Sequence, residues 1–174
     1  MRFKKYIIGI LSIFFLVFII LKSQGNIGVS KNNVEKDARK GQKIPEEWIT
    51  AKDIDNHFGG LLFYSEDLNN FTFSIYQNRP RVSVGYFFRL GGSLPGISDG
   101  ILKVTTNGEE DIFLSLNRVQ ISRIEINNGI NTKEILIENN KPFTVIIPKN
   151  SGEIKFYDID AHLIPDSIVT ETTL

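Results

Sequence analysis

The sequence predicts an all-β fold, an antiparallel β-sandwich, preceded by a short helix and an N-terminal transmembrane helix. Three observations lead to this prediction. An uncharged apolar run opens the chain, apolar and polar residues alternate from Leu61 onward, and turn residues interrupt that alternation about every 8 to 12 positions. A small β-barrel is the alternative, because the same strand pattern also closes into a barrel. We expect four regions, which are the membrane segment (1–22), a flexible basic linker (23–43), the β domain (44–165) and a frayed tail (166–174).

The membrane segment is predicted from its apolarity. Residues 6–21 carry no charge and are almost wholly apolar, Arg2, Lys4 and Lys5 precede them, and Lys22 ends the run. About a dozen Ile, Leu, Phe and Val residues, at roughly 0.3–0.6 kcal/mol each, favour a bilayer by roughly 4–7 kcal/mol. The dense basic residues before the run place the N-terminus inside the cell. We therefore predict an uncleaved, single-pass anchor in the cell membrane, with the domain on the extracytoplasmic side.

Cleavage of this segment is the alternative. The apolar run of about 16 residues is intermediate between the core of a signal peptide and a spanning helix. Ser23 and Gly25 are small residues at the spacing that signal peptidase reads. Cleavage after Gly25 would give a secreted protein, and this alternative stays open.

The next two segments are predicted to be a linker and a helix. Residues 26–43 contain few large apolar side chains and many Lys, Asn and Gly, which is typical of a flexible tether. Pro45 and the two glutamates after it form a helix-start pattern. We expect helix from here to Phe58, with Trp48 packed on the domain.

The β domain is predicted to contain nine strands. They are residues 61–65, 71–75, 81–89, 101–105, 112–116, 119–126, 135–137, 143–147 and 153–157. Asn107-Gly108 and Asn127-Asn128-Gly129 are expected to form tight turns, because Asn and Gly tolerate positive φ. Short links favour antiparallel neighbours throughout. The acidic residues 109–111 are expected to be a solvated flank of a hairpin.

Composition excludes several functions. The chain has no Cys, which excludes disulfides, thiol nucleophiles, Cys-ligated metals and a lipoprotein anchor. The formal net charge of zero gives no electrostatic reason to expect nucleic acid as a ligand. Residues 96–100 have the letters of a Gly-x-Ser-x-Gly elbow, and we expect them to lie in a Gly-rich loop without a catalytic triad. We predict no catalytic residues, no cofactor and no metal.

Two segments are candidate binding sites. The Gly-rich loop 90–100 is the longest predicted link in the domain, and its polar candidates are Ser93, Ser98 and Asp99. Asp158 and Asp160 are two residues apart, so that in an extended chain they would share one face. We interpret the segment around these two residues as a turn between short terminal strands, with a ligand site as the alternative.

These patterns together favour a membrane-tethered, non-enzymatic binding module for a protein or cell-wall partner. The abundance of Ile, Asn, Lys and Phe is typical of an AT-rich bacterial genome. One alternative is a secreted binding module released by cleavage near Gly25. The other is a carbohydrate-active hydrolase that uses Asp158 and Asp160, helped by His162.

Overall fold

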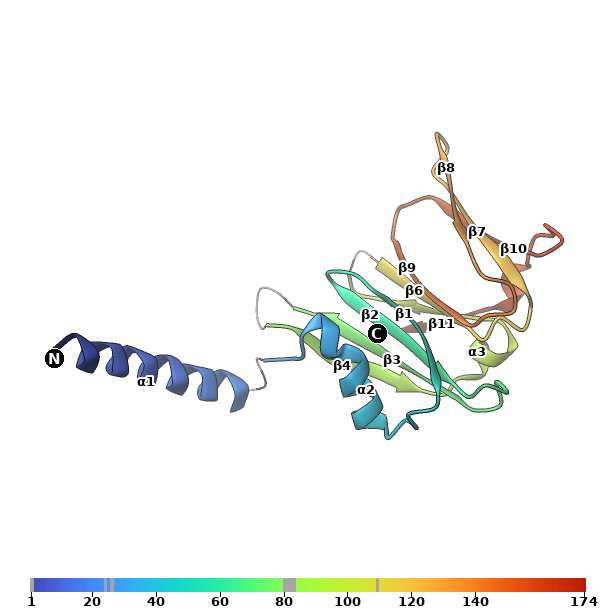
Figure 1. Ribbon diagram of the computed structural model, residues 1–174. Helices are drawn as coiled ribbons and strands as arrows, with labels where there is room; N and C mark the ends of the chain where they lie inside the picture. Colours follow the sequence, from blue (N-terminus) through green and yellow to red (C-terminus); the bar gives the residue numbers. More distant parts are fainter. Residues whose placement is uncertain (1, 24, 26, 80–83, 109) are drawn as a thin grey trace.

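The structure is a computed structural model that describes residues 2–23, 25, 27–79, 84–108 and 110–174 (Figure 1). In this part of the chain the fold is mostly β, and every pair of neighbouring strands but one is antiparallel. This confirms the all-β, antiparallel prediction. The strands form three stacked sheets, where a sandwich of two sheets was predicted.

Each sheet has a simple strand order. The first sheet is ordered β1-β2-β3-β4, with β1 (Ile49–Ile54), β2 (Phe58–Tyr64), β3 (Phe71–Asn78) and β4 (Tyr86–Gly92). The second is ordered β11-β5-β6-β9, with β11 (Val169–Thr173), β5 (Ile101–Thr105), β6 (Glu110–Ser115) and β9 (Phe143–Pro148). The third is ordered β10-β7-β8, with β10 (Glu153–Asp158), β7 (Ile121–Asn127) and β8 (Thr132–Leu136). The helices are α1 (Arg2–Ser23), α2 (Val34–Gln42) and α3 (Pro95–Asp99), with 3₁₀ turns η1 (Lys31–Asn33) and η2 (Asp166–Ile168).

The sheets and α2 stack as four layers, held by three apolar cores. The core between α2 and the first sheet contains Val34, Ala38, Ile44, Leu61, Phe63, Tyr76 and Tyr86. The core between the first and second sheets includes Phe58, Leu62, Phe73, Ile75, Leu102, Val104, Ile112 and Leu114. The core between the second and third sheets contains Ile101, Phe113, Ile121, Ile124, Ile126, Phe143, Ile147 and Phe156. β2 and β6 are buried at every position, because each faces an apolar layer on both sides.

The helix α1 points away from these layers (Figure 1). Its large apolar side chains between Tyr6 and Ile20 are each 45% to 71% exposed. In the described residues, no helix combines the length and the apolarity that a membrane crossing requires. The membrane location of this segment stays a prediction.

The flexible linker predicted for residues 23–43 is wrong over most of its length. Gly28 and Val29 donate backbone hydrogen bonds to Val84 and Tyr86, which fixes this segment to β4. The helix α2 follows, and its residues Val34 and Ala38 are 0% and 1% exposed. These two small apolar residues are one helical turn apart, so both face the first sheet.

The predicted helix up to Phe58 is also wrong. β1 occupies Ile49–Ile54 and pairs antiparallel with β2, from Ile49 opposite Tyr64 to Ile54 opposite Gly59. Pro45 and the glutamates after it lie in a turn instead. β-branched residues in β1 suit a strand, and pairing with the fully buried β2 outweighs the local helix-start pattern.

The predicted strands agree better with the structure. Each of the nine predicted segments overlaps an observed strand, although residues 81–83 and 109 lie outside the described residues. The turns at Asn107-Gly108 and Asn127-Asn128-Gly129 join β5 to β6 and β7 to β8. The prediction of a frayed tail over 166–174 is wrong, because β11 pairs in parallel with β5 from Val169 to Thr173.

The first and second sheets are also linked at their edges. β9 turns its unpaired edge toward β1, where the Ile146 N–H donates to Asp53 Oδ2 at 2.9 Å. The Thr144 hydroxyl donates to the Ala51 carbonyl at 3.2 Å. Side chains therefore satisfy this edge in place of a backbone ladder, and the half-buried charge of Asp53 there discourages further strand pairing.

Tyr76 ties α2 to the first sheet and gives the domain a predicted pH dependence. Its hydroxyl donates to Asp37 Oδ2 at 2.8 Å, and the residue is 2% exposed. Burial, followed by the Asp37 hydrogen bond and charge, raises the pKa of Tyr76. Ionisation is therefore easier in the unfolded chain, so this contribution is complete below about pH 10 and is lost as pH rises toward the folded pKa.

We expect the Tyr76→Phe variant to unfold with a free energy lower by about 1 kcal/mol at neutral pH. Above about pH 10, the wild type should lose up to about 1.4 kcal/mol per pH unit from this residue. The variant should lose stability less steeply, with the remainder from Tyr64 and Tyr86, whose pKa values burial also raises. Urea unfolding at a series of pH values tests this, and parallel pH profiles would contradict it.

Candidate ligand-binding groove

The groove arises where the third sheet covers only part of the second. Side chains of β5 alternate, so that Leu102 faces the first sheet while Ile101 and Lys103 face the third. Ile101 is packed beneath β7 and β10, but Lys103 lies beyond their cover. The uncovered part of this face is open to a ligand.

The groove encloses about 690 Å³. Its apolar floor is formed by Phe113 and Val169 from the second sheet and by Ile154 and Phe156 from the third. Its polar lining comprises Lys103, Thr105, Asp111, Lys149, Asn150, Asp166 and Glu171. This volume lies within the range of about 300–1,000 Å³ that small-molecule sites occupy. The groove therefore joins a hydrophobic surface to fixed charges of both signs.

Asp111 is the centre of these charges. It is 8% exposed, and it lies 3.4 Å from Lys103 Nζ through Oδ2 and 3.7 Å from Lys149 Nζ through Oδ1. The Oδ1 atom is buried and accepts no hydrogen bond from any residue that the structure describes. Two lysines therefore share one carboxylate at distances too long for strong hydrogen bonds.

The neighbouring groups hold these charges in place. Burial lowers the pKa of Lys103, but the Asp111 and Glu171 carboxylates outweigh burial and raise it. The hydrogen bond from the Thr105 hydroxyl, followed by Lys103, lowers the pKa of Glu171. Both ions therefore persist at neutral pH. Lysine ammonium groups beside an apolar floor suit a ligand that carries both carboxylate or carbonyl oxygens and apolar groups.

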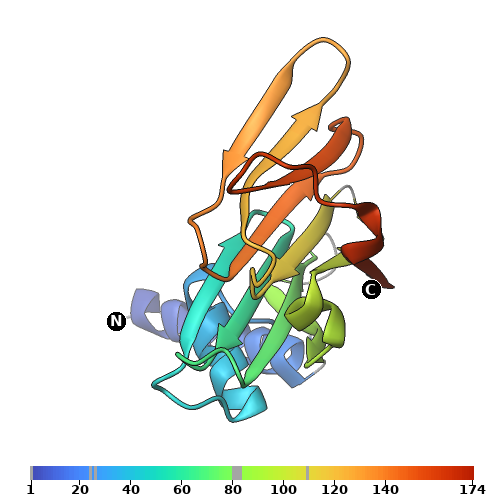
Figure 2. The same cartoon turned by 90° about the vertical axis from the view of Figure 1, so that its right-hand side faces the viewer.

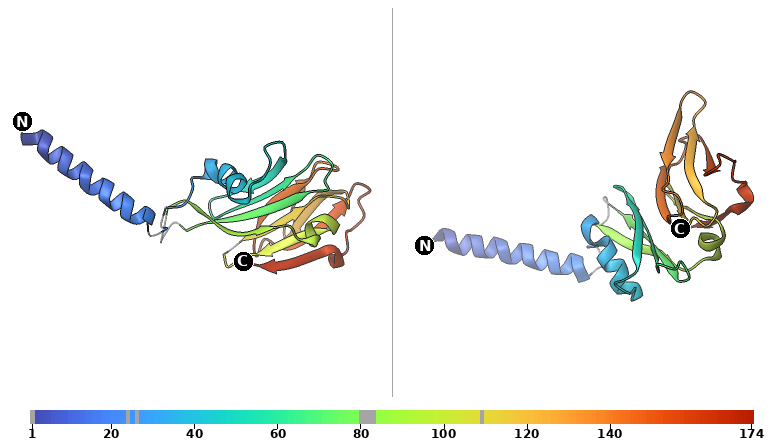
Figure 3. Two further views of the ribbon diagram at one scale, coloured as in Figure 1. Left: turned by 90° about the horizontal axis from the view of Figure 1, so that it is seen from below. Right: turned by 45° about the vertical axis from the view of Figure 1, so that its right-hand side comes forward.

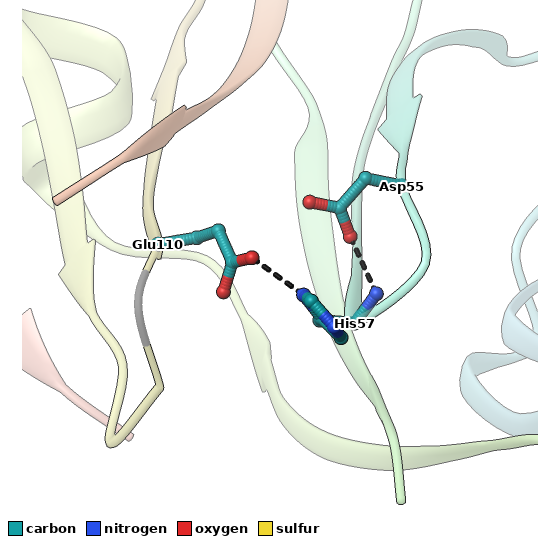
Figure 4. Close-up of side chains that lie close together, drawn as sticks. All are labelled: Asp55, His57 and Glu110. Carbon is teal, nitrogen blue, oxygen red and sulfur yellow. Dashed lines mark hydrogen bonds and ion pairs between the residues drawn. The ribbon is translucent and has the colours of Figure 1, made fainter. Parts of the chain in front are cut away.

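A second polar cluster joins the other side of the same hairpin to the first sheet (Figure 4). His57 Nδ1 lies 2.6 Å from Glu110 Oε1, and Asp55 Oδ1 accepts the backbone N–H groups of His57 and Phe58 at 2.7 Å. The ligand atoms of Asp55, His57 and Glu110 lie within 4.8 Å of one another, a donor set that a divalent cation accepts. Since Asp55 already closes the β1–β2 turn and Glu110 is 8% exposed, we assign this cluster a structural role.

The acidic hairpin flank was predicted to be solvated, and that prediction is wrong for residues 110 and 111. Glu110 and Asp111 are each 8% exposed. They are adjacent on β6, so their side chains point to opposite faces, Glu110 toward His57 and Asp111 into the groove. Each acid is buried beside a basic partner from another strand or turn, which is His57 for Glu110 and Lys103 for Asp111.

The predicted binding loop, residues 90–100, has a structural role in the domain. Residues 90–92 belong to β4, and α3 follows with Ile97 at 0% exposure. The Ser93 hydroxyl donates to the Phe71 carbonyl. The Ser98 hydroxyl lies 3.0 Å from the Pro95 carbonyl and 2.6 Å from Asp99 Oδ1. The segment thus seals one end of the core, and none of Ser93, Ser98 and Asp99 lines the groove.

Asp158 and Asp160 lie in a turn, as interpreted from the sequence. Asp158 Oδ1 accepts the backbone N–H groups of Asp160 and His162 at 2.9 Å and 2.8 Å. The His162 N–H bond is the main cause that lowers the pKa of Asp158. His162 Nδ1 lies 3.3 Å from Asp158 Oδ2, with His162 exposed and Asp158 partly buried. These contacts close the turn after β10, and they give the hydrolase alternative no support.

One feature of the sequence, Lys103, does indicate the groove. Lys103 interrupts the otherwise apolar run of β5, and a lysine in a strand with buried neighbours requires a partner. Its partners Asp111 and Glu171 come from β6 and β11, and only the fold brings them together.

No family model, no curated protein and no solved structure matches this chain.

Proposed function

We propose that this protein is a membrane-attached, extracytoplasmic binding module without catalytic activity. In this proposal α1 attaches the chain to the membrane, and the groove between the second and third sheets binds a peptide segment of a protein or cell-wall partner. The observation that carries the proposal is the groove itself, which combines an apolar floor with the Lys103, Asp111 and Lys149 charges.

A peptide segment suits this groove for two reasons. Apolar side chains of a peptide would cover Ile154 and Val169, the half-buried apolar residues of the floor, which removes apolar surface from water. Peptide carbonyl and carboxylate oxygens would accept hydrogen bonds from Lys103, whose Nζ lies 3.3 Å from Glu171 Oε1 and 3.4 Å from Asp111 Oδ2. Lys149, which donates to the Thr106 carbonyl, would add a second positive charge beside the ligand.

Membrane attachment is supported by the surface of α1. Apart from Ser12, whose hydroxyl donates to the Ile8 carbonyl, the described side chains from Tyr6 to Ile20 are apolar, and none of the large ones is less than 45% exposed. Such a helix gains stability when its surface is removed from water. Basic residues before it favour a cytoplasmic N-terminus and an extracytoplasmic domain.

Release by cleavage near Gly25 remains the alternative to anchoring. Mass spectrometry of the mature protein distinguishes the two. The proposal predicts an N-terminus at Met1 or Arg2 in the membrane fraction. A soluble extracellular chain that begins at residue 26 would replace anchoring by secretion, with the groove unchanged.

The binding role is tested by photo-crosslinking in intact cells. Asp166 lines the groove and is exposed, whereas Glu66 lies exposed in the β2–β3 turn and outside the groove. We expect a photo-reactive amino acid at position 166 to capture a specific partner, and the same amino acid at position 66 to capture none.

A charge variant then assigns the capture to the groove. The Lys103→Gln substitution removes one charged donor, which is expected to lower capture by about tenfold or more, because a hydrogen bond to a charged group contributes about 1.5–3 kcal/mol. The matched control is Lys133→Gln, on the exposed strand β8. Equal capture from positions 66 and 166, or capture that Lys103→Gln leaves unchanged, would contradict the proposed groove.

A further inference from the structure

The chain between α1 and the first sheet is short. Helix α1 ends at Ser23, and Ile27 is already bridged to Val84 beside β4. Four residue steps span at most about 14 Å. The flexible linker expected from the sequence would have allowed the domain to lie several times farther away. A membrane that holds α1 therefore has the domain close to its surface.

Helix α2 is the layer of the domain on the side nearest to α1 (Figures 1 and 3). Its buried side is fixed by Val34 and Ala38 in the core. Asp37 accepts the Tyr76 hydroxyl, and Gln42 Nε2 donates to the Phe73 carbonyl at 3.0 Å. These contacts set the rotation of α2 about its axis, and with it the face that α2 presents outward.

The outward face of α2 is basic. At 100° per residue, Lys36 and Lys40 lie opposite Val34 and Ala38, and Lys43 follows directly after the helix. These three lysines are exposed, and so is Lys31 in η1. Within the described residues none of the four lysine side chains forms a hydrogen bond or an ion pair.

The acids of the same region do not neutralise this face. Glu35 is engaged by Arg39 at 3.2 Å and by Lys52 at 2.6 Å, and Asp37 is engaged by Tyr76. Glu46 and Glu47 are exposed nearby and form no ion pair within the described residues, so four lysines are balanced by only two glutamates. We call the surface formed by Lys31, Lys36, Lys40 and Lys43 the basic face. It keeps a net positive charge.

We infer that the basic face docks on anionic lipid headgroups of the membrane that holds α1. The inference rests on the proposed membrane attachment and adds how the domain lies on the membrane. A positive face attracts anionic headgroups within about a Debye length of the surface, roughly 10 Å, which the short tether makes accessible. The third sheet, with its groove, would then lie on the far side of the domain, open to a partner (Figure 2).

The only Trp of the chain provides a probe for this docking. Trp48 packs on the core beneath α2, and its carbonyl accepts a hydrogen bond from Arg39 at 2.8 Å. It also lines a hollow together with Lys43. Quenching of Trp48 fluorescence by headgroup-labelled lipid therefore reports how closely the basic face approaches the bilayer.

The experiment uses the full-length protein in vesicles that contain a spin-labelled headgroup lipid. The vesicles are phosphatidylcholine alone or phosphatidylcholine with phosphatidylglycerol. We expect stronger quenching of Trp48 in the anionic vesicles and a loss of the increase at high salt. Each lysine is expected to shift the equilibrium toward docking about fivefold.

Two variants assign the effect. Lys31→Gln, Lys36→Gln, Lys40→Gln and Lys43→Gln together should abolish the increase, while glutamine preserves helix propensity. The control replaces Lys133, Lys141 and Lys155, in and beside the third sheet, with Gln and should keep the increase. Quenching that does not depend on phosphatidylglycerol, as expected if the face binds a soluble acidic polymer instead, would overturn the inference. So would an increase that survives in the quadruple variant.

The result separates this inference from the proposal beneath it. Flotation of the same vesicles measures attachment independently of Trp48. If the wild type floats with neutral and anionic vesicles but its quenching is equal in both, attachment stands and docking fails. If it floats with neither, membrane attachment itself fails, and the inference fails with it.

Discussion

Replacing Ile13 and Leu16 with aspartate should move the full-length protein from the membrane fraction to the soluble fraction. Both side chains lie near the middle of α1 and are 63% and 58% exposed. A charge at the centre of a membrane helix costs about 2.5–3.5 kcal/mol, and each lost apolar residue removes roughly 0.3–0.6 kcal/mol more. The double variant therefore loses about 6–8 kcal/mol, which offsets the roughly 4–7 kcal/mol that favours the bilayer.

Cell fractionation with an alkaline carbonate wash measures this change. The control exchanges the same positions conservatively, Ile13→Leu and Leu16→Ile, and should stay with the membrane. Because α1 projects from the domain, the thermal unfolding of the domain should be the same in all three proteins (Figure 1). An aspartate variant that stays membrane-bound would contradict attachment through α1.

The strands of the domain could be predicted because their signals are local. Alternating apolar residues and turn dipeptides such as Asn107-Gly108 depend only on neighbours in the sequence. The assembly of the strands into sheets is set by contacts between distant residues. β11 illustrates the difference, since its Thr-rich sequence resembles a tail until Val169–Thr173 pairs in parallel with β5.

The prediction of a flexible linker over residues 23–43 was wrong because this segment is held by a small buried surface. Two residues, Val34 and Ala38, fix α2, and neither makes the segment apolar on average. Further stabilisation comes from hydrogen bonds to distant residues, such as Gln42 to Ser74 at 2.6 Å. Composition measures average hydrophobicity, so it cannot detect such anchors.

The candidate groove could not be predicted from the sequence, because its charged residues come from separate strands. Lys103, Asp111 and Glu171 come from three strands, and their proximity depends on the register of β5 with β6 and β11. The register of β6 also decides which acidic residue, Glu110 or Asp111, faces His57. Sequence patterns identify charged residues within buried strands, but the fold decides how they are paired.

Gly60→Ala should destabilise the domain by up to about 3 kcal/mol, because the first and second sheets approach closely at this residue. A Cβ at Gly60 would lie 2.7 Å from Thr144 Cγ2 and 2.8 Å from Ile112 Cγ2. Both neighbours are β-branched residues in paired strands, so their methyl groups have few other positions. The added methyl must therefore separate β2 from β6 and β9, which weakens the core that these strands share.

The same substitution at Gly41 provides the matched control. Gly41 lies in α2 and is exposed, and apart from the neighbouring backbone of its own helix no atom lies within 4 Å of the position that a Cβ would occupy. Alanine there should stabilise the domain by about 0.5–1 kcal/mol, because glycine is the poorer helix former. Urea unfolding midpoints should then shift in opposite directions for the two variants. Equal or parallel shifts would show that the sheets do not meet at Gly60 as described.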